Sequence, residues 1–361
     1  MTDSATDMHK SRGNNFGFMR LLFATLVIVS HSPEFLDGNR SREIMSRIFG
    51  TMSFGEVGVH GFFIISGYLI TKSFVEGRST ISYLNRRFLR IVPGYLVCFL
   101  VCVLLVAPFV GGWQDLRSSA TIRELFAAVV TLRPPNVANV FQGAPYQALN
   151  GPMWTIAYEF RCYLATILVG CLGLYHVRYR VMLLAATTVL LALDAAHVMN
   201  GIHTRFDTLS GWPQYTVEFS GVFGVGALYY LFRDKITISR SGAIVAGILL
   251  LVFLFSSLLA AAAFTVLGGY LIFWFAFEGR VLGLSRWTNT VDISYGLYLY
   301  ACPIQQVIIW NDPSINPWLL CVLSILGAGT AGFASWTFVE KPMLRLAHRK
   351  TGGTPIVTRE A

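Results

Sequence analysis

The stretch GFMRLLFATLVIVSHSPEFL, residues 17–36, is a mostly apolar run of the length that a membrane-spanning helix needs, about 20 residues. Nine further runs along the chain have the same character. A pair of them meets near Ala260–Ala263, and we interpret that pair as two helices. We therefore predict an all-α fold, a polytopic transmembrane helical bundle of about ten spans: roughly 17–36, 54–76, 91–110, 153–173, 181–199, 215–232, 242–259, 262–278, 290–310 and 317–338.

The composition agrees with a membrane protein. Hydrophobic residues make up 54% of the 361 residues and charged residues 13%, whereas soluble domains carry about 25% charged residues. The formal net charge of +9 comes from Lys and Arg residues dispersed between apolar runs, without a basic groove, so we expect no nucleic-acid partner. The six cysteines lie in apolar runs and form no CxxC pair, so we expect no metal site.

The distribution of basic residues predicts the orientation. If the N-terminus is cytoplasmic, twenty Lys and Arg residues lie in inner segments and seven in outer loops, with Arg161 inside a span. Because cytoplasmic loops are enriched in Lys and Arg, both termini should be cytoplasmic. The longest outer loop, about 111–152, contains an amphipathic segment, Ile122–Leu132, which we interpret as an interfacial or re-entrant helix. The chain forms one domain, 1–361, with a helical core of about 16–345 and polar cytoplasmic tails.

The first span contains a possible catalytic pair. Arg20 begins the run and His31 follows eleven residues later, roughly 16 Å further along a helix and near mid-membrane. That rise is comparable to the reach of a phosphopantetheine arm. Imidazole suits proton transfer from a hydroxyl because its unperturbed pKa lies near neutrality. The alternative is that His31 is a hydrogen-bonded structural residue beside the kink at Pro33.

Two further segments supply small and basic residues. In GVHGFFIISGYL, residues 58–69, the glycines allow close approach of a helix or a ligand, and Ser66 offers a hydroxyl. His60 in this segment is interpreted mainly as a local polar contact. In YLNRRFLRIVP, residues 83–93, Arg86, Arg87 and Arg90 are helical neighbours that could hold phosphate oxygens. Helix packing and anchoring to anionic lipid are the respective alternatives.

Carboxylates in the outer halves of later spans suggest a polar cavity that opens to the outside. Glu159 lies in GPMWTIAYEF, residues 151–160, beside Trp154 and Tyr158. It could orient His31, bind sugar hydroxyls or pair with Arg161. Asp194 and Glu218 occupy similar depths in their spans, so a sugar could enter from this side.

In this order and spacing, these segments resemble acyltransferase family 3, the membrane O-acyltransferases. The pattern is matched by an Arg well before a His in the first helix, by FF-x-x-SG-[FY], by R-x-x-R before I-x-P, by W-[ST]-x-x-x-E, and by the late segments ISYGLYLYACPIQ (293–305) and FVEKP (338–342). The resemblance covers about residues 16–345. Many members have a His before the Pro of the ninth helix, where this chain has Cys302, so no second catalytic His is expected there.

The resemblance implies a bacterial inner-membrane, multi-pass enzyme that transfers an acetyl or other acyl group from cytoplasmic acyl-CoA to a hydroxyl of an extracytoplasmic saccharide, such as O-antigen or exopolysaccharide. Acetyl-CoA would be a co-substrate, with no permanently bound cofactor. The expected partners are acyl-CoA, a glycan or lipid-linked saccharide, and membrane lipids. The candidate residues are His31 and Glu159 for catalysis; Arg20, Arg86, Arg87, Arg90, Ser66, Gly67 and Tyr68 for acyl-CoA; and Trp154, Tyr158, Asp194 and Glu218 for the acceptor.

Several alternatives stay open at the level of sequence. A transporter or flippase of an acyl carrier or lipid-linked sugar would also need many helices with internal charges, although the internal repeats common in transporters are not visible. An acyltransferase acting on a secreted small molecule would differ only in its acceptor. Transfer could be direct or could pass through an acyl-His intermediate. Because the chain stops just after its last predicted helix, a separate periplasmic protein could also receive the acyl group.

Overall fold

A computed structural model of the chain describes residues 14–77, 79–204, 207, 211–279, 285 and 287–349. Within these residues all regular structure is helical. The longer helices are α2 (Phe16–Asp37), α4 (Phe54–Val75), α5 (Thr80–Val101), α7 (Ser119–Thr131), α8 (Thr155–Cys171), α9 (Arg180–Ala195), α11 (Pro213–Leu231), α12 (Arg240–Phe253), α14 (Gly269–Glu278), α16 (Ser294–Asn311) and α17 (Pro317–Ser335). The shorter ones are α3 (Ile44–Phe49), α6 (Ala107–Phe109), α13 (Ala260–Ala263) and α18 (Lys341–Arg349).

Five helical segments are long and apolar enough to cross a membrane. Three of them are made of two α-helices joined through a π-helical turn, as where α5 continues through Cys102–Val106 into α6. The membrane class is thereby supported, while ten spans and the orientation of the termini stay predictions. The tails on which that orientation bears, 1–13 and 350–361, lie outside the described residues. The five segments are Phe16–Asp37, Phe54–Val75, Thr80–Phe109, Ala260–Glu278 and Pro317–Leu346.

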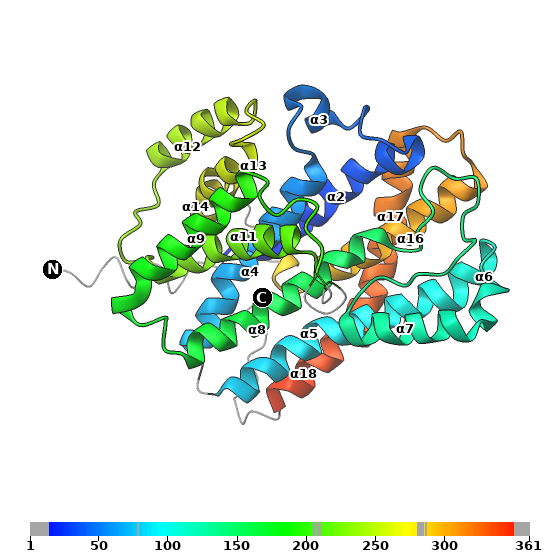
Figure 1. Cartoon of the computed structure of the whole chain (residues 1–361), viewed down its shortest axis with the longest axis horizontal. Helices are drawn as coiled ribbons and strands as arrows, with labels where there is room; N and C mark the ends of the chain where they lie inside the picture. Colours follow the sequence, from blue (N-terminus) through cyan, green and yellow to red (C-terminus); the bar gives the residue numbers. More distant parts are fainter. Residues whose placement is uncertain are drawn as a thin grey trace.

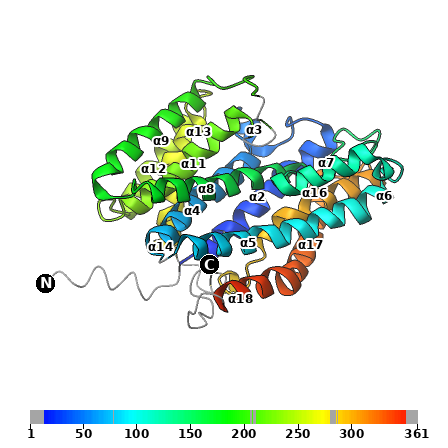
Figure 2. The ribbon, with the colours of Figure 1, turned by 60° about the horizontal axis from the view of Figure 1, so that its bottom comes forward.

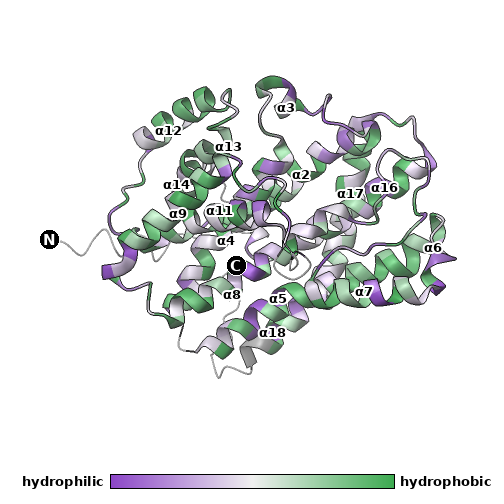
Figure 3. Cartoon of the chain, in the orientation of Figure 1, coloured by the Kyte–Doolittle hydropathy of each residue, from purple (hydrophilic) through white to green (hydrophobic). Residues whose placement is uncertain are grey.

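Helices α2 and α4 form the centre of the molecule (Figures 1 and 2). Helices α11 and α9 lie on one side of α4, and α16 and α17 pack against α2. The peripheral helices turn apolar side chains outward, and they are mostly green in the hydropathy colouring of Figure 3. On α12, for example, Ile248 and Val252 are 59% and 62% exposed. An apolar exterior of this kind matches hydrocarbon rather than water as the surrounding solvent.

Glycines allow the central helices to approach closely. A Cβ at Gly58 would lie 2.7 Å from the carbonyl oxygen of Phe23, so α4 touches the backbone of α2. Gly67 of α4 and Gly226 of α11 meet in the same way, because a Cβ on either would lie 2.0 Å from a backbone oxygen of the other helix. These glycines are therefore used for helix packing, as small residues commonly are in membrane proteins.

Two local predictions can be compared with the described helices. The amphipathic segment Ile122–Leu132 is helical as far as Thr131, where α7 ends, and its exposed side chains Ile122, Phe126 and Val130 follow an i, i+4, i+8 stripe. The apolar stretch around Ala260 is divided into two helical segments, but the break follows Phe253 at the end of α12, and the predicted junction Ala260–Ala263 is itself helical, as α13. The position of α7 at a membrane interface stays a prediction.

Candidate active site

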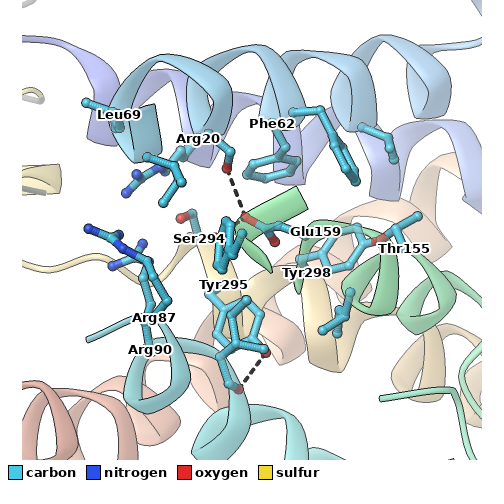
Figure 4. Close-up of a pocket in the computed structure, with 17 residues that line it drawn as sticks. Arg20, Phe62, Leu69, Arg87, Arg90, Thr155, Glu159, Ser294, Tyr295 and Tyr298 are labelled. Atoms are coloured by element: carbon cyan, nitrogen blue, oxygen red, sulfur yellow. Dashed lines mark hydrogen bonds between the residues drawn. The ribbon is translucent and has the colours of Figure 1, made fainter. Parts of the chain in front are cut away.

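A pocket lies between α2, α4, α5, α8 and α16 (Figure 4). Its α4 wall extends from Val59 to Ile70, which corresponds to about 16 Å along the helix axis. The lining is mostly apolar with polar side chains at its middle, and the arginines lie together on one side. The lining residues are Arg20, Val59, Phe62, Phe63, Ser66, Leu69, Ile70, Arg87, Arg90, Ile91, Thr155, Ile156, Glu159, Tyr163, Ser294, Tyr295 and Tyr298.

Three of the four predicted donor-site arginines line this cavity. Arg20 and Arg90 share one carboxylate oxygen, Oδ2 of Asp292, at 3.2 and 2.7 Å. The other oxygen of Asp292 accepts hydrogen bonds from the backbone N–H and hydroxyl of Ser294 at the start of α16. The Asp292 side chain is only 3% exposed. This carboxylate fixes two guanidinium groups from different helices, and the sequence reasoning did not identify it.

Arg87 has a different environment from the other two cavity arginines. It donates one hydrogen bond to the Ser73 hydroxyl at 2.9 Å, and its buried Nε has no partner among the described residues. A buried guanidinium with unused donors is suited to bind phosphate oxygens. Arg86, in contrast, donates to the Ser82 hydroxyl on its own helix and does not line the cavity. The predicted role of Arg86 in donor binding therefore has no geometric support.

The middle of the cavity contains Glu159. Its Oε1 accepts hydrogen bonds from the Ser66 hydroxyl at 2.8 Å and from the Tyr163 hydroxyl at 2.6 Å. The structure thus brings two predicted site residues, Ser66 and Glu159, together in the pocket that three arginines also line. Figure 4 shows Glu159 and these arginines. Ser66 is followed by Gly67 and Tyr68, which do not line the cavity: Gly67 contacts α11, and the Tyr68 ring packs against Phe273 of α14. Their contacts in the structure are helix-packing contacts, and their role in acyl-CoA binding stays a prediction.

His31 lies beyond the cavity, toward the end of α2. The neighbour contacts Val27 with Gly58 and Ser30 with Gly55 show that α2 and α4 run in opposite directions. His31 is therefore level with the beginning of α4, and its depth near mid-membrane stays a prediction. Its Nδ1 lies 3.0 Å from Oε2 of Glu34. The interpretation that Glu159 orients His31 is not matched, because Glu159 bonds to Ser66 and Tyr163 instead.

The predicted acceptor residues gather where α4, α8 and α11 meet. Glu218 lies 2.8 Å from Nε2 of His60, a ring that is 3% exposed. Asp194 of α9 interacts electrostatically with both of them. Trp154 and Tyr158 belong to an aromatic group that also contains Tyr215 and Phe219. None of the four predicted acceptor residues lines the cavity.

A polar band connects this group with His31. Arg40, in the loop after α2, donates to Glu34 at 3.1 Å and pairs with Glu56 at 3.3 Å. Glu56 in turn interacts electrostatically with His60. Burial lowers the pKa of Arg40, but Glu56 and Glu34 more than offset this effect and the pKa is raised. Among the residues that the structure describes, no group of three or more His, Cys, Asp or Glu side chains could hold a metal ion.

Comparison with known proteins gives a consistent set of matches. A family model described as an acyltransferase domain, that of acyltransferase family 3, matches residues 14–336. The chain is 27% identical to an "O-acetyl transferase" of Shigella phage Sf6 over 348 residues, which cover 93% of this chain and 97% of the phage protein. It is 23% identical to "Nodulation protein 10" of Rhizobium leguminosarum bv. viciae over 367 residues, covering 92% and 94% of the two chains. No solved structure gives a significant match.

Proposed function

This chain belongs to acyltransferase family 3, and from that premise we propose that it is an O-acyltransferase of the bacterial inner membrane. The proposed reaction moves an acetyl or other acyl group from cytoplasmic acyl-CoA to a hydroxyl of an extracytoplasmic saccharide, such as O-antigen or exopolysaccharide. The O-acetyl transferase name of the phage relative supports the reaction type. The observation that carries the proposal is the elongated apolar cavity with three arginines on one side.

The arginines support an acyl-CoA donor. Guanidinium groups bind phosphate oxygens through two parallel hydrogen bonds, and coenzyme A carries a pyrophosphate and a 3′-phosphate. Each of the three arginines donates one hydrogen bond, but Arg87 has no carboxylate partner among the described residues, while Asp292 holds Arg20 and Arg90 in place. The apolar wall along α4 suits the pantetheine arm. The acyl end then has to extend past Val59, toward the beginning of α4, to reach His31.

The polar band at the beginning of α4 supports an acceptor that arrives from the side opposite the arginines. Carboxylates and aromatic rings are suited to hydroxyl groups and to the apolar faces of sugar rings. We propose that Glu218 and Asp194, with the aromatic group around Trp154 and Tyr158, form the approach for the saccharide. In this arrangement donor and acceptor meet near His31 from opposite directions.

The proposed chemistry is general-base catalysis by His31. Its imidazole takes the proton from the acceptor hydroxyl while the hydroxyl oxygen attacks the thioester carbonyl carbon. The C–S bond breaks, and the thiolate of coenzyme A receives the proton that His31 had accepted. The products are the O-acyl saccharide and free coenzyme A. Glu159 is proposed to act on the donor side, because it lies beside the arginines rather than beside His31.

The test is transfer of radiolabelled acetyl from acetyl-CoA to glycan by the full chain in proteoliposomes. His31→Ala should reduce the rate by about 10²–10⁴, as expected for loss of a general base. His176→Ala is the matched control, since His176 is exposed between α8 and α9. Full transfer by His31→Ala would refute the mechanism. Movement of label across the bilayer without labelled glycan, by the parent protein, would favour the transporter alternative.

A further inference from the structure

The imidazole of His31 is held on one edge and on one face. Its Nδ1 lies 3.0 Å from Glu34 Oε2, one helical turn further along α2. The Phe35 ring lies parallel to the imidazole, with ring centroids 4.6 Å apart and planes 8° apart. Tyr146 from the long outer loop stacks on Phe35 in turn, at 4.6 Å. These contacts leave little freedom to the plane of the His31 ring.

Glu34 is itself anchored by the loop that follows α2. Its second oxygen, Oε1, accepts a hydrogen bond from Nε of Arg40 at 3.1 Å. Arg40 also reaches Oε1 of Glu56. Glu56 is fixed by a capping box, in which its side chain accepts from the Ser53 backbone at the start of α4. The carboxylate beside His31 is therefore connected to two helices through one arginine.

This geometry selects one tautomer of the imidazole. A carboxylate accepts hydrogen bonds but does not donate them, so the Nδ1 atom facing Glu34 carries the proton. The lone pair then resides on Nε2, which forms no hydrogen bond with any of the described residues. A His whose far nitrogen is fixed by a carboxylate is the arrangement that general-base catalysis uses.

Two other histidine–carboxylate pairs occur among the described residues. In His203–Asp207 the carboxylate also faces Nδ1, but this pair lies at the surface, with His203 67% exposed, away from the pocket. In the His60–Glu218 pair the carboxylate faces Nε2, and the ring is 3% exposed. The remaining nitrogen of His60, Nδ1, is buried and has no hydrogen-bond partner in the part of the chain that the structure describes. His31 is 19% exposed, so its free nitrogen can meet a substrate, whereas the ring of His60 is enclosed by α4 and its neighbours.

We infer that Glu34 is the positioning residue of His31: it fixes the Nδ1–H tautomer and directs the Nε2 lone pair to the acceptor hydroxyl, with Arg40 holding Glu34 in place. This inference rests on the proposed function, since it assigns a task to a residue beside the proposed base. Glu34 touches no substrate in this scheme and acts through the imidazole.

The experiment compares kcat and KM of Glu34→Gln and Glu34→Asp in proteoliposomes with acetyl-CoA and glycan. Glu34→Gln should lower kcat at least about tenfold, the effect typical of losing a partner that orients a reactive histidine. The KM for acetyl-CoA should stay near the parental value, because the arginines of the cavity are untouched. Glu34→Asp keeps the charge on a shorter side chain and should recover part of the loss.

Asp37→Asn provides a matched control. Asp37 ends the same helix and pairs with Arg42 in the same loop, and among the described residues it forms no hydrogen bond or ion pair with His31. The kcat of Asp37→Asn should equal that of the parent, and the melting temperatures of Asp37→Asn and Glu34→Gln should agree. A second experiment combines Glu34→Gln with His31→Ala. The double variant should have the same residual rate as His31→Ala alone.

Three outcomes would overturn the inference. The first is a parental kcat in Glu34→Gln, and the second is a loss of kcat in Asp37→Asn equal to that in Glu34→Gln. The third is that Glu34→Gln lowers the rate of His31→Ala by the same factor as it lowers that of the parent. Each of these leaves the proposed function intact as long as His31→Ala alone abolishes transfer. Conversely, full activity of His31→Ala would refute the proposed base and not merely its positioning residue. The two failures are therefore distinguishable.

Discussion

Replacing Asp292 by Asn removes one negative charge and leaves two arginines without their counter-ion. Arg20 and Arg90 each place a nitrogen within 3.2 Å of the same Asp292 oxygen. All three side chains are largely buried, at 12%, 22% and 3% exposed. Asn keeps the volume and one acceptor oxygen, so the change isolates the charge.

The expected loss of stability is substantial. Breaking a buried ion pair by removing one partner typically costs about 3–5 kcal/mol, because the remaining charge is left uncompensated. The amide oxygen of Asn still accepts one hydrogen bond, which favours the lower end of that range. An unfolding entropy of about 2.1 cal/mol/K per residue gives about 0.76 kcal/mol/K for 361 residues. A loss of about 3 kcal/mol therefore predicts a decrease of roughly 4 °C in the melting temperature.

Donor binding should reverse part of this loss. With the carboxylate gone, the phosphates of acetyl-CoA become the counter-ions of Arg20 and Arg90, and a ligand that binds only the folded state stabilises it. Acetyl-CoA should therefore raise the melting temperature of Asp292→Asn by more than it raises that of the parent. The assay is thermal unfolding of detergent-purified protein with and without acetyl-CoA.

Asp312→Asn is the control for this experiment, because Asp312 follows the other end of α16 and, within the described residues, its exposed carboxylate accepts hydrogen bonds only from Ser314. It should unfold like the parent. If Asp292→Asn also unfolded like the parent, the ion pairs would contribute nothing. Equal stabilisation of parent and variant by acetyl-CoA would refute the placement of donor phosphates at these arginines.

Three further predictions concern single features of the molecule. Arg87→Ala should raise the Kd for a non-hydrolysable acetyl-CoA analogue roughly tenfold to a hundredfold, since a charge-assisted hydrogen bond contributes about 1.5–3 kcal/mol. Arg87→Lys should recover only part of that loss in calorimetric titration, and equal affinity of all three proteins would contradict the phosphate assignment. Gly67→Ala should cost about 1–3 kcal/mol by overpacking against Phe223, whereas Gly329→Ala, with nothing within 4 Å, should unfold like the parent. At either terminus, a fused reporter that works only in the cytoplasm should be active, and one that works only in the periplasm should be inactive. Activity of the periplasmic reporter would contradict the predicted topology.

Features that depend on local sequence were predicted well. The hydrophobic runs that contain α2 and α4 were predicted within a few residues, because a membrane span needs about 20 apolar residues. The arginines at positions 20, 87 and 90 do line one cavity, since helical spacing places them on inward-facing surfaces. The segment 242–259 was predicted as a full span, whereas α12 has 14 residues. Hydropathy alone does not show where an apolar run stops being helical.

Features that depend on distant contacts were not predicted. Asp292 lies 202 residues after Arg90, and no sequence pattern indicates which carboxylate pairs with an arginine in another helix. Glu159 was considered as the partner of His31 because it lies in a motif, but its own neighbours satisfy it. Gly67 was interpreted as part of a binding segment, although its lack of a side chain serves the contact with α11. The partner of His31 was nearer: Glu34, three residues later, follows from helix geometry alone.

The ion pairs of Asp292 also constrain how the protein is made. Arg20 and Arg90 leave the ribosome long before their partner, which follows them by 272 and 202 residues. At a synthesis rate of about 5–20 residues per second, Arg90 waits roughly 10–40 s for Asp292. During that interval the two guanidinium groups lack the counter-ion that they share in the folded chain, so water or lipid phosphates have to compensate both charges. The ion-pair cluster that joins α2, α5 and the start of α16 can therefore form only after Asp292 has been synthesised.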